Sequence, residues 1–323
     1  MLPPPKPPVA PAPPVAPAPP FVLPEGCDEV LHLLGSTRLS DFLSFVREHT
    51  DFGAAVEPMD LAESWRNAAT VYEELGTADA YPAEAPEVFP IPDGMRRHCD
   101  ELLSKPHIQR EFNLVPVALG MVPLAQVIAM QPRVNITTAN SVRFAEGSIS
   151  DEALAAICLP LDAPPHSLRV LEHDDAGITF TADNHDIRFL VAEVAPGSAV
   201  TLSGRGHVEQ VLALPVGFSS NVLNVIRFKN RLVLNNGYHR AFALWQRGVT
   251  HVPAVIHVCR HWEDVGLAGA SEIYDNAPVY FDRARPPMLK DFADRRLCMS
   301  LAATRARKYV RIRYQVETGY LRD

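Results

Sequence analysis

The sequence predicts an α+β fold, with a disordered proline-rich tail, a mainly helical front region and a mixed α/β domain behind it. Three observations predict this arrangement. Twelve of the 30 prolines lie within the first 24 of 323 residues. Apolar residues recur at helical spacing up to residue 133, and short runs rich in Val, Ile, Thr and Phe follow. We therefore expect a tail over residues 1–28, a helical region over 29–133 and an α+β domain over 134–323.

Composition places the chain among ordinary globular proteins. Hydrophobic residues make up 47% and charged residues 21%, which is enough apolar material for a sizeable core. No apolar run reaches the length of a membrane-spanning helix, so a membrane partner is not expected. The net charge of −8 argues against a general nucleic-acid binder. Five scattered cysteines without a C-x-x-C pair predict reduced thiols and a cytoplasmic location.

Charge is distributed unevenly along the chain. Residues 1–130 carry a net charge of −10, whereas residues 285–323 carry +6. The acidic front and the basic back are expected to attract each other, within the molecule or between subunits, or to be two solvated surfaces.

The first 20 residues are nearly all Pro, Ala and Val, with one charge at Lys6. Such a segment has little to bury and favours an extended polyproline II conformation. It is interpreted as a passive spacer, as a tether, or as a ligand for the proline-binding groove of a protein partner.

Helices are expected in four places in the front region. Ser40 is a plausible N-cap for a helix that carries Phe42 and Val46. The others cover Asp60–Leu75, which ends at Gly76, then Asp93–Leu103, and the apolar stretch Val115–Met130, which its two prolines divide.

Strands are expected in the back half, with one regular unit among them. The separate strands cover 177–181, 188–191, 199–202 and 309–316. The regular unit is a hairpin from Val222 to Leu234, a glycine turn, a helix over Tyr238–Gln246 and a strand over Val252–Val258. Strand, turn, helix and strand in this order indicate a compact crossover.

The glycine turn carries the strongest functional pattern, Asn236-Gly237-Tyr238-His239-Arg240. Glycine permits a sharp turn, and the helix that follows offers free N–H groups and a positive dipole end to an anion. His239 and Arg240 would add charge-assisted hydrogen bonds to a phosphate. The alternative is a structural turn in which Arg240 pairs with a nearby carboxylate.

The stretch from Leu234 to Leu244, followed by Gly248-Val249 and Val252–Ile256, resembles the core motif of the ParB/sulfiredoxin superfamily. The resemblance covers about residues 196–258. It implies a ParB/sulfiredoxin-like domain in which Gly237, His239 and Arg240 face nucleotide phosphates, with ATP or CTP and Mg²⁺ as the implied cofactors. Tyr238 stands where sulfiredoxins have a catalytic cysteine, and Asn236 where related free-serine kinases have an aspartate, so neither activity is implied.

The chain after the tail also resembles an uncharacterised group of bacterial, notably cyanobacterial, proteins. Three segments carry this resemblance: Phe112–Pro116, the Asn-Asn-Gly-Tyr-His-Arg stretch, and Arg285–Phe292. It implies no activity, but it suggests that the front and back halves work as one unit.

Other candidate residues are more isolated. Arg285 and Lys290 flank a double proline and are expected either to reach the same anion or to join a basic surface. Glu209 is interpreted as a base, as a metal ligand, or as the partner of a surface arginine. His257, Cys259 and His261 would share one face of a strand, but a fourth zinc ligand is missing, and no metal site is expected.

Two functions remain open from the sequence. The favoured one is binding of a nucleotide or another phosphorylated ligand at the Gly-Tyr-His-Arg turn, with hydrolysis or transfer of phosphate as an extension. The alternative is a non-catalytic interaction or assembly protein, whose tail and acidic helices recruit a partner.

Overall fold

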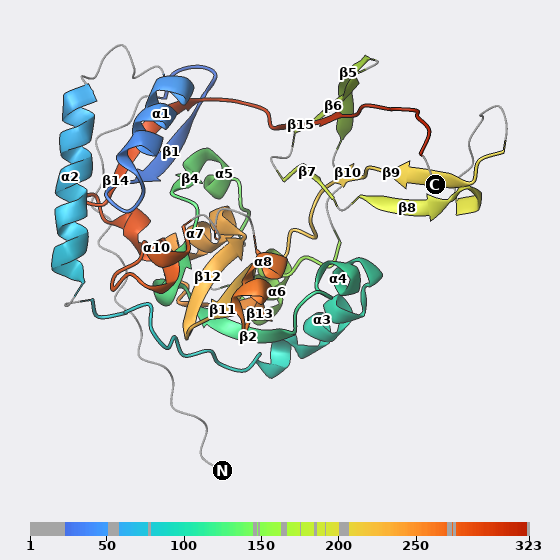
Figure 1. The fold of residues 1–323 in the computed structure, drawn as a ribbon. Helices are drawn as coiled ribbons and strands as arrows, with labels where there is room; N and C mark the ends of the chain where they lie inside the picture. The colour runs from blue at the N-terminus through green and yellow to red at the C-terminus, as the bar shows by residue number, and fades with distance from the viewer. Residues whose placement is uncertain are drawn as a thin grey trace. The chain divides into compact units, whose positions relative to one another are not determined.

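The computed structural model describes residues 23–50, 58–76, 79–144, 147, 149–162, 167–174, 176–183, 186–190, 192–199, 207–269, 273 and 276–321. Within these residues the chain has the expected α+β composition of helices and sheets (Figure 1). The tail up to residue 22 and residues 200–202 of the strand expected over 199–202 lie outside the described residues, and Ala199 ends a short 3-10 helix. Contacts divide the chain into a first unit, residues 1–161 with 222–305, and a second unit, residues 162–221 with 306–323.

The centre of the first unit is a mixed five-stranded sheet in the order β2-β13-β11-β12-β3. Its strands are β2 (Val117–Pro123), β3 (Val127–Ala129), β11 (Asn224–Phe228), β12 (Arg231–Asn236) and β13 (His251–Val258). The pairs β11–β13 and β12–β3 are parallel, and the other two pairs are antiparallel. Consecutive residues of β12 and β13 are buried, so both faces of this sheet are covered.

The expected front helices are present at three of four positions. They are α1 (Leu39–His49), α2 (Pro58–Leu75) and α3 (Asp93–Ser104), and a short α4 (Pro106–Glu111) follows. The N-cap of α1 is Arg38, so the assignment of Ser40 as the cap was wrong. Figure 1 shows α2 beside α1, and α4 beside α3.

The front region is less helical than expected. Strand β1 (Cys27–Leu33) occupies its start, and β2 and β3 occupy the apolar stretch that was expected to form a broken helix. Strand β1 lies between β14 (Cys298–Thr304) and β4 (Arg133–Asn135) in an antiparallel sheet. Strands β2 and β3 lie in a nearly continuous apolar run, which periodicity alone does not distinguish from a buried helix.

The regular unit of the back half is present, with one difference. The hairpin β11–β12 turns at Lys229 and Asn230, which have positive φ angles of 47° and 58°. Helix α7 (Tyr238–Gln246) then leads to β13. However, β11 lies between β12 and β13 in the sheet, so the strands that flank α7 are not neighbours.

Two hydrophobic cores stabilise the first unit. The larger one surrounds the five-stranded sheet, and the smaller one joins α1, α2 and β14 through residues such as Phe42, Tyr72 and Leu301. The other elements among the described residues of this unit are η2 (Leu124–Gln126), α5 (Ile136–Asn140), α6 (Asp151–Cys158), α8 (Trp262–Ala268), α10 (Ala277–Phe281) and η4 (Leu289–Ala293).

The second unit is built from short strands. The order of its three-stranded sheet is β15-β6-β5, with β5 (Leu168–Asp174), β6 (Gly177–Ala182) and β15 (Tyr309–Arg313). Two-strand pairs are formed by β7 (Arg188–Phe189) with β10 (Val216–Gly217), and by β8 (Glu193–Pro196) with β9 (Gln210–Ala213); η3 (Gly197–Ala199) follows β8. The strands expected near 177, 188 and 309 are thus present.

Candidate functional site

Gly237 begins α7 in the left-handed region, at φ +97°. The residue is buried, and a Cβ atom there would lie 2.9 Å from Cγ and 3.2 Å from Cα of Leu223. Only glycine fits this position without strain. Asn236 supports the turn, because its side-chain oxygen accepts a hydrogen bond from the Gly237 N–H at 2.9 Å and its amide donates to the Val222 carbonyl at 3.3 Å.

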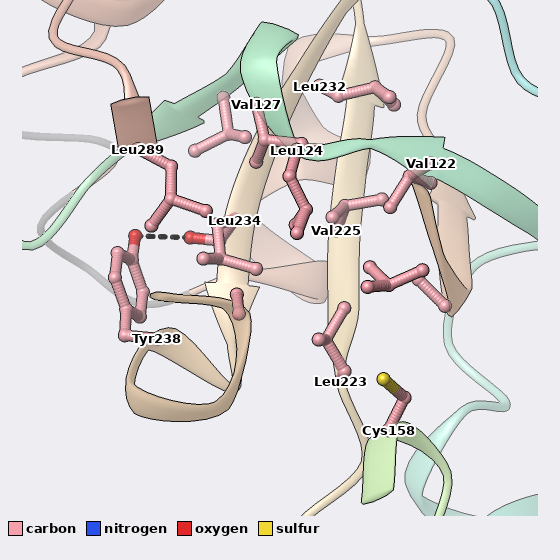
Figure 2. Close-up of a cluster of buried hydrophobic side chains, with 14 of the residues drawn as sticks. Val122, Leu124, Val127, Cys158, Leu223, Val225, Leu232, Leu234, Tyr238 and Leu289 are labelled. Atoms are coloured by element: carbon pink, nitrogen blue, oxygen red, sulfur yellow. Dashed lines mark hydrogen bonds between the residues drawn. The ribbon is translucent and has the colours of Figure 1, made fainter. Parts of the chain in front are cut away.

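Tyr238 points into the core, where it joins three backbone groups. Its hydroxyl accepts hydrogen bonds from the N–H groups of Met130 at 2.7 Å and Gln131 at 3.1 Å. The same hydroxyl donates to the Leu234 carbonyl, the contact drawn as a dashed line in Figure 2. With 3% of its surface exposed, Tyr238 therefore joins α7 to the ends of β3 and β12.

Arg240 contacts the C-terminal end of α6. Its guanidinium donates to the carbonyls of Ile157 at 2.9 Å and Cys158 at 3.3 Å. A cation is favourable there, because the last carbonyls of a helix lack partners within the helix and carry its negative dipole end. Burial raises the pKa of the Cys158 thiol to about 12, and Arg240 opposes that shift. Arg240 thus contacts a helix end, where the sequence suggested a phosphate or a carboxylate.

His239 lies in the first turn of α7 and is partly buried. Of the five turn residues, Gly237 and Tyr238 are buried, and Asn236, His239 and Arg240 keep some exposed surface.

Arg285 and Lys290 belong to a buried ionic network. The guanidinium of Arg285 lies 2.7 Å from Asp79 and donates to the two carboxylate oxygens of Asp291 at 2.5 and 3.0 Å. Lys290 donates to the same Asp79 and to the Tyr81 carbonyl at 2.7 Å. The two cations therefore do not form an open basic surface, because they pair with Asp291, which is buried, and with Asp79, whose side chain is only 11% exposed.

Tyr72 completes this network from α2. Its hydroxyl donates to Asp291 at 3.1 Å, and the Arg285 guanidinium lies 5.5 Å from its ring centre. Burial, together with the neighbouring Asp291 carboxylate, raises the pKa of Tyr72, so the hydroxyl stays protonated as a donor. Burial also lowers the pKa of Lys290, although Asp79 opposes that shift.

Both groups of residues border the same strand. Met130, just after β3, donates to Tyr238, and Ala129 donates to the Pro287 carbonyl at 2.8 Å. The candidate residues of the glycine turn and those of the Arg285–Lys290 segment therefore lie in neighbouring parts of the first unit. Their partners differ, however, because Arg240 binds helix carbonyls whereas Arg285 and Lys290 bind carboxylates.

Glu209 lies in the second unit, just before β9. Its carboxylate is 3.0 Å from His207, and both side chains are at least 80% exposed. The partner of this exposed carboxylate is a histidine, where the sequence suggested an arginine, and the exposure of the pair does not fit a shielded base.

The zinc pattern has separate structural roles. His257 is buried against the ring of Phe112, 5.2 Å away, and burial lowers its pKa to about 4. His261 is the N-cap of α8, where it contributes to a capping box with Asp264. Within the described residues, no three His, Cys, Asp or Glu side chains are arranged to hold a metal ion.

A shallow hollow of about 150 Å³ lies between α5 and the C-terminal end of α7. Asn140, Phe144, Gln246 and Arg247 contribute to its lining, and the Arg247 guanidinium lies 4.5 Å from the Phe144 ring centre. The hollow is at the opposite end of α7 from Gly237, so it is not part of the glycine turn.

Three residues of the ionic network, Tyr72, Asp79 and Asp291, were not among the candidates that the sequence indicated. Tyr72 and Asp79 are more than 200 residues away from their partners in the chain, and no local pattern marks them. Asp291 does lie beside Lys290 and after a double proline, which was a usable indication of an ordered polar loop.

Comparisons with protein-family models, with curated proteins and with solved structures found no match to this chain. No helix among the described residues is long and apolar enough to cross a membrane.

Proposed function

We propose that this chain is a non-catalytic interaction or assembly protein, in which a ParB/sulfiredoxin-like strand–turn–helix serves as the scaffold. The observation that carries the proposal is the pairing of Arg240, the permanent cation of the turn, with the Ile157 and Cys158 carbonyls. Tyr238 supports it, since its hydroxyl is used within the core. The turn joins α6, α7 and two strands through these contacts. This structural role accounts for Tyr238 and Arg240 without a bound ligand.

Exposed apolar side chains support an interaction role. Val194 and Leu212 are cross-strand partners on β8 and β9, and they are 67% and 62% exposed. Leu168, Val170 and Leu171 on β5 are also exposed. Neighbouring exposed apolar residues are typical of protein interaction surfaces. The proline-rich tail and the acidic helices remain further proposed recruitment segments, and the unpaired state of all five cysteines supports a cytoplasmic location.

The second candidate function is binding of a phosphorylated ligand at the start of α7. It is favoured by the left-handed Gly237, which opens the helix, and by the partly exposed His239 beside it. ATP or CTP with Mg²⁺ would then be the ligand, and hydrolysis or transfer of phosphate the reaction.

Titration of the full chain with ATP, CTP and inorganic phosphate, each with and without Mg²⁺, separates the two functions. The assembly function predicts no binding and no increase in melting temperature at millimolar concentrations. A ligand at 100 times its Kd would stabilise the fold by about 2.7 kcal/mol, an increase that thermal unfolding detects readily. Such an increase would contradict the assembly function.

A further inference from the structure

Strand β5 is an edge strand with exposed apolar side chains. It pairs with β6 on one side and has no strand on its other side among the described residues. All seven of its residues are exposed, and Leu168, Val170 and Leu171 are 41%, 58% and 64% exposed. An edge of this kind presents unpaired backbone N–H and C=O groups to another strand.

A bulge in β5 places two opposite charges on one face. The register with β6 shifts by one residue between Val170 and Glu172. Arg169 lies 3.5 Å from Asp183, and Glu172 lies 3.1 Å from Arg311, across the same face of the sheet. In a regular strand, residues three apart point to opposite faces. The bulge therefore makes it possible for Arg169 and Glu172 to share a face.

This arrangement is complementary to itself. Two antiparallel copies of β5, related by a two-fold axis between Val170 and Leu171, place Arg169 of each copy opposite Glu172 of the other. Val170 then lies opposite Leu171 of the other copy. The pairing forms two reciprocal ion pairs around an apolar centre, which is the pattern of an isologous dimer interface.

The other edge of the sheet lacks this complementarity. Strand β15 carries Arg311 and Arg313 as exposed residues. Two antiparallel copies paired about the middle of β15 would bring Arg311 against itself, which is unfavourable. Charge therefore selects β5 and not β15 as the edge for self-pairing.

We propose that a second copy of this chain binds along the free edge of β5, so that the two sheets become one continuous sheet in a symmetric dimer. The proposal rests on the assembly function and deepens it by naming the partner. Backbone hydrogen bonds between the strands supply affinity, and the Arg169–Glu172 pairs fix the register.

Sedimentation of the full chain over a range of concentrations tests this proposal through a charge swap. The unmodified chain is expected to dimerise. Arg169→Glu and Glu172→Arg, each alone, place like charges opposite each other twice and should weaken the dimer about tenfold. The double variant restores opposite charges and should recover most of the affinity. Arg313→Glu, on the other edge, is the matched control and should leave the dimer unchanged.

Leu171→Lys is a second variant, because a lysine on a free edge opposes strand pairing. It should give a monomer with an unchanged melting temperature, which shows that the subunit still folds. A chain that stays monomeric, or a dimer that none of the β5 variants weakens, would overturn the proposal. Neither outcome affects the assembly function, which nucleotide binding by the unmodified chain would contradict whatever its oligomeric state.

Discussion

Gly237 is the residue on which the geometry of the turn depends most directly. Its φ of +97° is strained for any other residue, and Leu223 fills the space where a side chain would start. Gly237→Ala should lower the free energy of unfolding by about 2–4 kcal/mol, since backbone strain and steric overlap add together. Urea denaturation of the two proteins measures this difference.

Gly248 is the matched control for that substitution. It also has a positive φ, +78°, but a Cβ atom there would meet nothing within 4 Å. Gly248→Ala should therefore lower the free energy of unfolding by about 1 kcal/mol, because only the backbone strain of the positive φ contributes. Equal losses for the two variants would show that Leu223 moves aside and that the side chains around Gly237 are not tightly packed.

At the scale of single residues, the sequence predicts what depends on neighbours in the chain. A glycine before an amphipathic helix indicated the turn, and the structure places Gly237 as the helix N-cap. The partner of Arg240 could not be predicted, because the carbonyls that it contacts are 82 and 83 residues away. An arginine beside a glycine turn has the same local pattern whether it binds a phosphate or a helix end.

At the scale of elements, the segment from Arg285 to Asp291 holds α2 and the loop around Asp79 in place. Arg285 and Asp291 are 5% and 2% exposed, so their charges depend on compensation by each other, by Asp79 and by the hydrogen bond from Tyr72. Arg285→Ala would leave Asp291 as a buried carboxylate with less compensation. The free energy of unfolding should fall by about 3–5 kcal/mol, as measured by denaturant titration.

Arg296, which forms an exposed ion pair, is the matched control for Arg285→Ala. It pairs with Asp294 at 2.7 Å, but its side chain is 60% exposed. Arg296→Ala should cost less than about 1 kcal/mol, because solvent screens such a pair. If Arg285→Ala were equally mild, the network would not stabilise the fold, and the two cations would be available for another role.

The sequence predicted some elements better than others for a physical reason. Helix α2 and the β11–α7–β13 unit have regular periods bounded by glycine, and they were predicted. Strands β1 and β2 were missed. Strand β2 lies in a nearly continuous apolar stretch, and its last four residues are all buried, so its sequence shows no alternation of apolar and polar residues. The order of the strands depends on pairing between distant segments, which local patterns do not encode.

At the scale of the whole molecule, the uneven charge along the chain has a partial explanation within the first unit. Asp79, from the acidic front, pairs with Arg285 and Lys290 from the basic back. Asp28 likewise lies 3.0 Å from Arg305. The expected attraction between the two ends is therefore present inside the molecule. The sequence could indicate the attraction, but it could not identify the pairs.

The two units also differ from the consecutive segments expected from composition. The first unit combines residues from both sides of residue 134, and the second is completed by β15, which pairs with β6 more than 120 residues earlier. Composition changes along the chain mark where helices give way to strands. They do not reveal which distant strand returns to complete a sheet.

Arg240→Ala tests the central claim, that the Gly237 turn is a scaffold, most directly. Loss of the hydrogen bonds to the end of α6 should lower the free energy of unfolding by about 2–3 kcal/mol. The control Arg247→Ala, an exposed residue just beyond the same helix, should cost less than about 1 kcal/mol. The unmodified chain should show no nucleotide or phosphate affinity for Arg240→Ala to weaken. Unchanged stability, together with a ten- to hundredfold loss of nucleotide affinity, would contradict the claim.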